Sequence, residues 1–95
     1  MQLNGKVAVV TGGARGIGKA IATAFAERGA TLALLDLNQG DLDATCAEFA
    51  ARGVKVSGHA LNVAKEDEVV RVFDEVVADH GRLDVVVNNA GIIKD

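Results

Sequence analysis

A glycine-rich segment that joins an apolar run to an amphipathic run constrains the fold of this chain more than any other feature. Residues 7–10 (VAVV) are apolar and rich in β-branched residues, which predicts a short strand buried on both faces. From Ile17 onward, apolar residues recur at the spacing of one helix face, and Gly29 is placed to end that helix. The segment TGGARGIG at 11–18 lies between them. The sequence therefore predicts a strand, a tight glycine turn and a helix.

The same alternation repeats along the chain. Further strands are predicted at residues 31–35, 54–61 and 83–87, the middle one being the weakest. Two amphipathic helices separate them. The first of these is predicted to end at Gly53, and the second to follow an N-cap at Ala64 and to end at Gly81. Short connections between alternating strands and helices indicate a parallel sheet.

The handedness of strand–helix–strand connections restricts the topology of this sheet. Right-handed crossovers predict an α/β fold of the Rossmann type, a doubly wound parallel sheet βαβαβαβ with strand order 3-2-1-4. Because 95 residues are fewer than an ordinary domain of about 150, the chain is either one small domain or part of a larger one, without an internal boundary. The topology is that of the first half of a doubly wound sheet, so residues 1–95 are expected to be the N-terminal portion of one larger domain. By themselves they would leave an apolar strand edge at 85–87, so they are not expected to form a cooperative monomer.

Composition excludes several classes of protein. Apolar residues make up 49% of the chain and charged residues 24%, which is typical of a folded protein. The net charge of −3 and the lack of a basic block argue against a nucleic-acid partner. No apolar run approaches the roughly 18 residues that span a bilayer, and no signal peptide is recognisable. With a single cysteine, Cys46, the sequence predicts a cytoplasmic protein without an intrachain disulfide.

The glycine turn has the properties of a phosphate-binding loop. Glycines tolerate positive φ and let an anion approach the backbone, while the following helix offers free N–H groups. The spacing TGxxxGxG lacks the Gly-Lys-Ser/Thr ending of a P-loop, which disfavours an ATPase. Asp36 follows Gly18 by 18 residues, where a carboxylate can accept hydrogen bonds from an adenosine ribose. This combination favours dinucleotide binding over a turn with no ligand.

The charge of Asp36 also bears on which dinucleotide binds. A carboxylate repels the 2′-phosphate of NADP(H) and accepts from both ribose hydroxyls of NAD(H), so NAD(H) is favoured. Arg15 is the opposing signal, because a guanidinium could pair with a 2′-phosphate. The alternatives for Arg15 are exposure to solvent or an ion pair with Asp36.

With TGGARGIG after the first strand and NNAG at 88–91 after the fourth, the sequence resembles the short-chain dehydrogenase/reductase family over all 95 residues. The resemblance implies contacts with the pyrophosphate at Gly12, Arg15, Gly16, Ile17 and Gly18. It also implies adenosine contacts at Asp36, Leu37, Asn62 and Val63. Near the nicotinamide it implies contacts at Asn89, Ala90 and Gly91. Leu61-Asn62-Val63 and residues 92–95 are similar to the 3-oxoacyl-acyl-carrier-protein reductases of this family, which implies an acyl-thioester substrate in fatty acid metabolism.

In this family a tyrosine, a lysine and a serine support hydride transfer between nicotinamide and a carbonyl or hydroxyl. The chain contains no tyrosine, so no catalytic residue is assigned and residues 1–95 alone are expected to be inactive. Ser57 and Lys94 are not assigned either, because the sequence places neither beside a suitable partner. His59 and His80 show no metal-ligand spacing, so no metal is expected. The family also implies a homo-oligomer, a tetramer, for the complete protein.

Two other functions share part of these signals. A non-catalytic dinucleotide-binding module or sensor would carry every motif seen here. A methyltransferase that binds S-adenosylmethionine also uses a glycine loop and a ribose-binding acid, but NNAG has no role in it.

Overall fold

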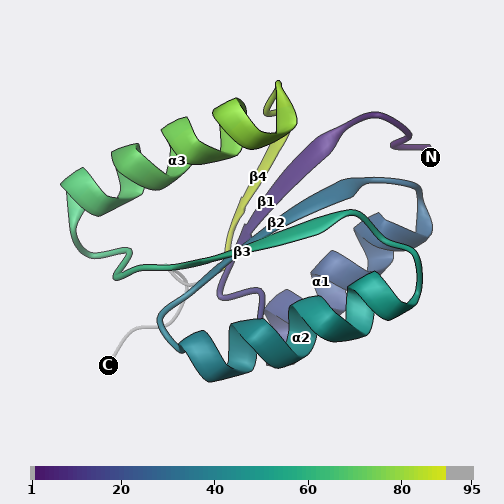
Figure 1. Ribbon diagram of the computed structural model, residues 1–95, viewed down its shortest axis with the longest axis horizontal. Coiled ribbons are helices and arrows are strands. Elements are labelled where there is room, and N and C mark those ends of the chain that lie inside the picture. The colour runs from purple at the N-terminus through teal and green to yellow at the C-terminus, as the bar shows by residue number, and fades with distance from the viewer. Residues whose placement is uncertain (1, 90–95) are drawn as a thin grey trace.

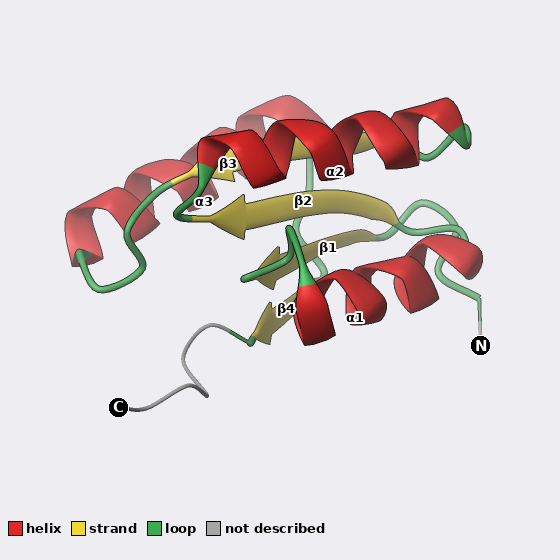
Figure 2. Cartoon of the chain, turned by 90° about the horizontal axis from the view of Figure 1, so that it is seen from below, coloured by secondary structure: helices red, strands yellow, loops and turns green. Residues whose placement is uncertain are grey.

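Four parallel strands form one sheet in the order β3-β2-β1-β4, which confirms the predicted topology (Figure 1). The computed structural model describes residues 2–89. The strands are β1 (Val7–Thr11), β2 (Thr31–Asp36), β3 (Val56–Ala60) and β4 (Val85–Asn88). All four arrows point to the same side in Figure 2, so the carboxyl ends of the strands share one edge. β1, β2 and β4 each end one residue later than predicted, β4 also begins two residues later, and β3 is shorter than predicted at both ends.

Three helices cover the two faces of the sheet. They are α1 (Gly16–Glu27), α2 (Gln39–Ala51) and α3 (Glu66–His80). Figure 1 shows α1 and α2 on one face and α3 on the other. Successive strand residues point to opposite faces, so the neighbours Val9 and Val10 of β1 enter different clusters. Val10 packs with Leu42 and Phe49 of α2, and Val9 packs with Val76 of α3. The two cores explain why β1 and β2 are apolar at nearly every position.

The start of α3 differs from the prediction. Lys65, rather than Ala64, is the N-cap, and the helix begins at Glu66. The cause is a local turn made by Asn62, whose side-chain oxygen accepts from the Ala64 N–H at 2.9 Å and whose carbonyl accepts from the Lys65 N–H at 3.0 Å. Because Ala64 belongs to this turn, α3 begins one residue later than predicted. At the other end α3 stops as predicted at Gly81, which has a left-handed φ of 82°.

Within residues 2–89, none of the helices is both long enough and apolar enough to cross a membrane.

Candidate functional site

The glycine turn after β1 brings the start of α1 into direct contact with the end of the strand. A Cβ atom added at Gly18 would lie 1.9 Å from the Gly12 carbonyl oxygen, so only glycine allows this close packing. Gly12 and Gly16 have φ values of 66° and 60°, a conformation that other residues rarely adopt. The predicted roles of these glycines in shaping the turn are therefore confirmed.

The N-terminus of α1 is open to a ligand. Its N-cap, Arg15, makes no side-chain hydrogen bond to the helix, and the first helical bond runs from the Lys19 N–H to the Arg15 carbonyl at 3.2 Å. The N–H groups of the first three helical residues therefore have no acceptor within the helix. Space above Gly16 is free of protein atoms within 4 Å of an added Cβ. A cradle of free N–H groups beneath open space fits a pyrophosphate.

Asp36 at the end of β2 lies directly beside the turn. One carboxylate oxygen accepts from the Leu37 N–H at 2.8 Å and the Asn38 N–H at 3.3 Å. The other oxygen accepts from the Ala14 N–H at 3.2 Å. The sequence predicted this carboxylate at the carboxyl edge but missed its bond to Ala14, which links the turn to β2.

Arg15 does not pair with Asp36, which corrects one of the alternatives considered for it. Its guanidinium lies 3.5 Å from the Asp41 carboxylate of α2, and its side chain is 74% exposed. An ion pair this exposed contributes little to stability and can be exchanged for a ligand.

The residues expected to contact adenosine line one shallow cavity of about 150 Å³. Its walls are Gly12, Asp36, Leu37, Leu61, Asn62 and Val63. The N–H of Asn62 donates to Glu68 of α3 at 3.0 Å, which fixes the loop after β3 against that helix. The structure thus brings together residues from three separate loops, as the sequence predicted.

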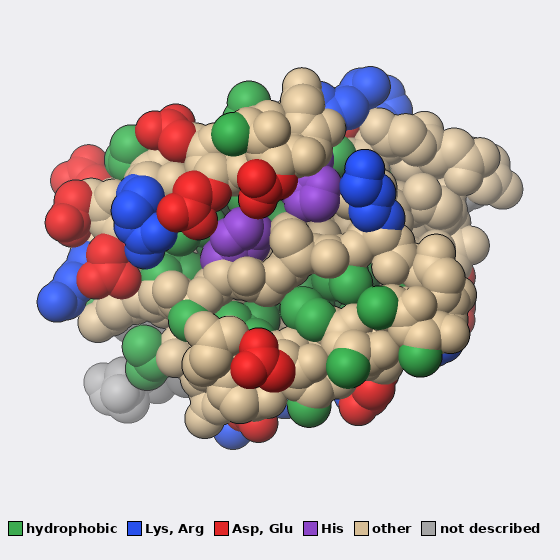
Figure 3. Space-filling model, viewed as in Figure 1, with side chains coloured by type: hydrophobic (Ala, Val, Ile, Leu, Met, Phe, Trp, Pro, Cys, Tyr) green, Lys and Arg blue, Asp and Glu red, His purple; other side chains and the backbone are tan. Residues whose placement is uncertain are grey.

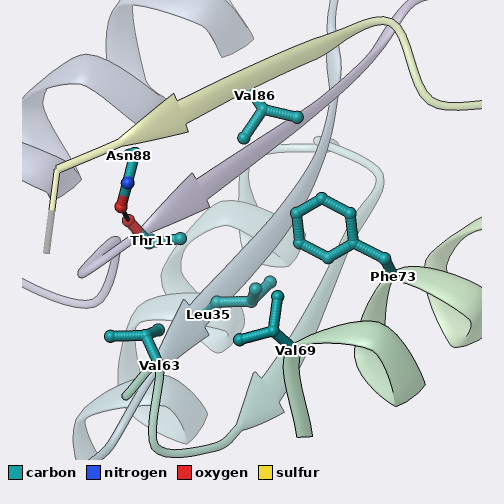
Figure 4. Close-up of a pocket in the computed structure, with 7 residues that line it drawn as sticks. All are labelled: Thr11, Leu35, Val63, Val69, Phe73, Val86 and Asn88. Carbon is teal, nitrogen blue, oxygen red and sulfur yellow. Dashed lines mark hydrogen bonds between the residues drawn. The ribbon is translucent and has the colours of Figure 1, made fainter. Parts of the chain in front are cut away.

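A second cavity of about 160 Å³ lies on the α3 side of the same edge (Figure 4). Val69 and Phe73 of α3 and Val86 of β4 make it largely apolar, and Thr11 and Asn88 face each other at its rim. The Thr11 hydroxyl lies 3.2 Å from the Asn88 side-chain oxygen and joins the ends of β1 and β4. The sequence analysis missed this cavity, because apolar spacing on a helix does not distinguish a core side chain from a cavity wall.

The described part of the NNAG segment touches the glycine turn. The Asn89 side-chain amide donates to the Gly12 carbonyl oxygen at 3.4 Å, so the end of β4 supports the turn after β1. The other two predicted contacts of this segment, Ala90 and Gly91, lie outside the described residues.

Ser57 and both histidines form a cluster that the sequence analysis missed. The Ser57 Oγ lies 3.0 Å from Nε2 of His59 and 2.9 Å from Nε2 of His80, and His59 Nδ1 lies 3.4 Å from a Glu75 oxygen. The sequence placed no partner beside Ser57, whereas the structure places both imidazoles within hydrogen-bond distance of it. Both imidazoles appear together in purple beside α3 in Figure 3.

This cluster is separate from the carboxyl edge of the sheet. Ser57 pairs with Ala33 in the sheet register, whereas Asp36 at the edge pairs with Ala60. Burial, followed by the nearby charge of Lys55, lowers the pKa of His80. Among residues 2–89 no group of three or more potential ligands could hold a metal ion.

Cys46 is half-buried on α2, and its thiol shows no sign of activation. Burial raises its pKa, and the neighbouring Asp43 carboxylate raises it further. A raised pKa disfavours the reactive thiolate at neutral pH.

A Rossmann-type doubly wound sheet with a glycine turn at its switch point is the architecture of proteins that bind dinucleotides at the carboxyl edge. A model of the family described as short chain dehydrogenase matches residues 6–95. The chain belongs to this family of oxidoreductases that use nicotinamide cofactors.

Individual relatives differ in their substrates. The chain is 44% identical over 95 residues to a 3-oxoacyl-acyl-carrier-protein reductase of Thermotoga maritima, covering all of this chain and 39% of that protein. An NAD+-bound xylitol dehydrogenase superposes with a TM-score of 0.86 at 37% identity, covering 90% of this chain and 33% of that one. L-sorbose reductase from Gluconobacter frateurii, complexed with NADPH and L-sorbose, superposes with a TM-score of 0.89 at 38% identity. The match covers 94% of this chain and 34% of the reductase. The chain thus spans between a third and two fifths of these proteins.

Proposed function

We propose that this chain is the dinucleotide-binding part of an NAD(H)-dependent oxidoreductase that transfers hydride between nicotinamide and a carbonyl or hydroxyl group. The observation that carries the proposal is the uncapped N-terminus of α1 behind a glycine turn, with Asp36 bonded to that turn. A pyrophosphate and an adenosine ribose need these two features side by side.

The proposed contacts follow the carboxyl edge. The backbone of the turn and of the first turn of α1 holds the pyrophosphate, around Gly12, Arg15, Gly16, Ile17 and Gly18; the Gly12 N–H itself is bonded to the Leu35 carbonyl at 2.6 Å. The cavity beside the turn takes the adenosine, with Asp36 and Leu37 at the ribose and Asn62 and Val63 at the adenine. The segment after β4 takes the nicotinamide-side ribose, at Asn89, Ala90 and Gly91. The bound dinucleotide would supply or accept the hydride.

NAD(H) is preferred over NADP(H) in this proposal because of the charges around the adenosine cavity. Asp36 lines the cavity and would lie close to a 2′-phosphate, which it repels. Arg15 opposes this preference, but it can offset the repulsion only by giving up its exposed ion pair with Asp41, which leaves a second carboxylate unpaired. Solved relatives include proteins bound to NAD+ and to NADPH, so the preference rests on the residues of this chain.

Replacing Asp36 with alanine tests the proposal. Asp36→Ala removes the repelling charge, so the affinity for NADP+ relative to NAD+ should rise about tenfold, measured by calorimetric titration of both cofactors. Asp43→Ala, which removes the same charge from the exposed face of α2, should leave the ratio unchanged. An unchanged ratio in Asp36→Ala would contradict the assigned role of this carboxylate, and failure of the unmodified protein to bind either cofactor would overturn the proposal.

The substrate we propose is a 3-oxoacyl or 3-hydroxyacyl thioester, handled by a cytoplasmic homotetramer in fatty acid metabolism. Support comes from Leu61-Asn62-Val63 and from the likeness to the Thermotoga reductase. The chain has no tyrosine, so the residues that move the proton lie outside it and residues 1–95 alone should be inactive.

The same lack of tyrosine keeps a non-catalytic dinucleotide sensor as the second candidate. Oxidation of NADH by the complete protein in the presence of a 3-oxoacyl thioester distinguishes the two. Turnover supports the oxidoreductase, and cofactor binding without turnover of any carbonyl substrate supports the sensor.

A further inference from the structure

Ala14, in the middle of the glycine turn, is held from both sides by side chains of other elements. Its N–H donates to Asp36 of β2 at 3.2 Å, and its carbonyl accepts from the Thr45 hydroxyl of α2 at 2.5 Å. Ala14 itself is buried. Two side-chain hydrogen bonds from outside the turn therefore hold Ala14, in addition to the bonds from the Gly12 and Gly13 N–H groups to the Leu35 carbonyl.

Thr45 is an unusual residue for its position. It is 3% exposed and lies on the apolar stripe of α2 between Leu42 and Phe49, where a hydroxyl without a partner would be unfavourable. A threonine inside a helix commonly donates to the carbonyl four residues before it, as Thr23 does to Lys19 in α1 at 2.8 Å. Thr45 instead donates to a residue 31 positions away.

The bond from Thr45 fixes the peptide unit that joins Ala14 to Arg15. In a planar trans peptide the carbonyl and the following N–H point in opposite directions. Because Thr45 holds the Ala14 carbonyl toward α2, the Arg15 N–H points away from α2. This N–H belongs to the group that the proposed function assigns to the pyrophosphate.

We infer that Thr45 is a positioning residue for the phosphate-binding turn, acting on the dinucleotide through the Ala14 carbonyl. This inference rests on the proposed function, because it concerns the same site. Asp36 and Thr45 have different roles under this inference. Asp36 holds the turn and would also face the ribose, whereas Thr45 holds the turn only. A substitution at Thr45 should therefore affect the pyrophosphate and leave the adenosine contacts intact.

The test compares Thr45→Val with Thr45→Ser in the full protein. Valine keeps the shape of threonine but cannot donate, so the Kd for NADH, measured by fluorescence titration, should rise about tenfold. Serine keeps the hydroxyl and should bind NADH within about twofold of the unmodified protein. The matched control is Thr23→Val, which removes a hydroxyl bonded only within α1 and should not change the Kd. If Thr45→Val does not fold, Thr45→Cys, with a weaker donor, takes its place.

Displacement of NADH by ADP and by adenosine distinguishes a local effect on the turn from general destabilisation, because destabilisation would weaken the binding of both competitors equally. Thr45→Val should weaken the binding of ADP about tenfold and leave the binding of adenosine unchanged, because only ADP carries the pyrophosphate. Equal binding of NADH and ADP by Thr45→Val and the unmodified protein would overturn the inference, as would equal losses for ADP and adenosine. Absence of NADH binding to the unmodified protein would instead overturn the proposed function.

Discussion

Gly18 is the residue at which the packing of the site is tightest. A Cβ added there would lie 1.9 Å from the Gly12 carbonyl oxygen and 2.9 Å from the Asn89 side-chain amide. Both neighbours belong to the proposed cofactor site, and the Gly12 oxygen is backbone, which cannot move aside without changing the turn. A larger side chain at residue 18 should therefore directly disturb the proposed cofactor site.

Gly18→Ala should consequently weaken NADH binding more than tenfold and lower the free energy of unfolding by about 2 kcal/mol. Fluorescence titration and urea denaturation measure the two effects. Gly40→Ala is the control, because an added Cβ there makes only an ordinary contact at 3.4 Å with the side-chain oxygen of Asn38, the N-cap of α2. This control should stabilise the protein by about 0.5–1 kcal/mol and leave binding unchanged. Normal NADH affinity in Gly18→Ala would show that the turn is not where the pyrophosphate binds.

At the residue scale the sequence predicted which residues meet at the carboxyl edge better than it predicted their hydrogen-bond partners. The glycines and Asp36 were identified because their spacing after a strand has a direct physical meaning. The bonds that Ala14 donates to Asp36 and accepts from Thr45 were not, because they depend on how β2 and α2 pack against the turn. Likewise, nothing in the sequence distinguishes Asp41 from Asp36 as the partner of Arg15.

At the scale of elements, the cluster around Ser57 connects β3 to the C-terminal end of α3. A carboxylate can only accept, so His59 donates from Nδ1 to Glu75, and with both imidazoles neutral its Nε2 accepts from the Ser57 hydroxyl. Ser57 then accepts from Nε2 of His80. This leaves Nδ1 of His80 unprotonated, and that atom is buried without a hydrogen-bond partner among the described residues.

Protonation of His80 should therefore weaken the attachment of α3. Burial lowers its pKa below the ordinary 6.5, Lys55 and His59 lower it further, and Asp79 opposes them. When the folded pKa is the lower one, the unfolded chain binds more protons between the two values, so stability falls as the pH drops below about 6.5. Urea denaturation at a series of pH values measures this loss.

His80→Gln removes the titrating group, so the free energy of unfolding should change less with pH between about pH 7 and pH 5. Asp84 does not interfere, because its hydrogen bond with Arg82 lowers its pKa to about 2 and its contribution is lost only below about pH 4. An equally steep dependence in His80→Gln would contradict the role assigned to His80.

The elements themselves were largely predictable, and their exceptions have local causes. The sequence predicted all four strands and three helices, because buried parallel strands are continuous apolar runs whereas amphipathic helices repeat apolar residues every three to four positions. The N-cap of α3 was misplaced because the Asn62 turn extends over Ala64. The meeting of Ser57, His59 and His80 was missed because it requires the docked position of α3.

At the scale of the whole molecule, the sheet collects the proposed site along one edge. Loops after β1, β2, β3 and β4 supply its residues, and the order β3-β2-β1-β4 puts the glycine turn in the middle. Crossover handedness made this order predictable from the sequence. The apolar strand edge predicted at residues 85–87 is also present: β4 pairs only with β1 in the sheet formed by residues 2–89, and Val86 is 48% exposed beside the second cavity.

Hydrogen–deuterium exchange with and without saturating NADH is the most direct test of the central claim that this edge binds a dinucleotide. We predict slower exchange of backbone N–H groups at 12–18, 36–38 and 62–63, where the ligand would cover or accept from them, and no change at 52–55 on the opposite edge. Gly18→Ala should lose this protection. Unchanged exchange at 12–18 under saturating NADH, or protection confined to the opposite edge, would contradict the account.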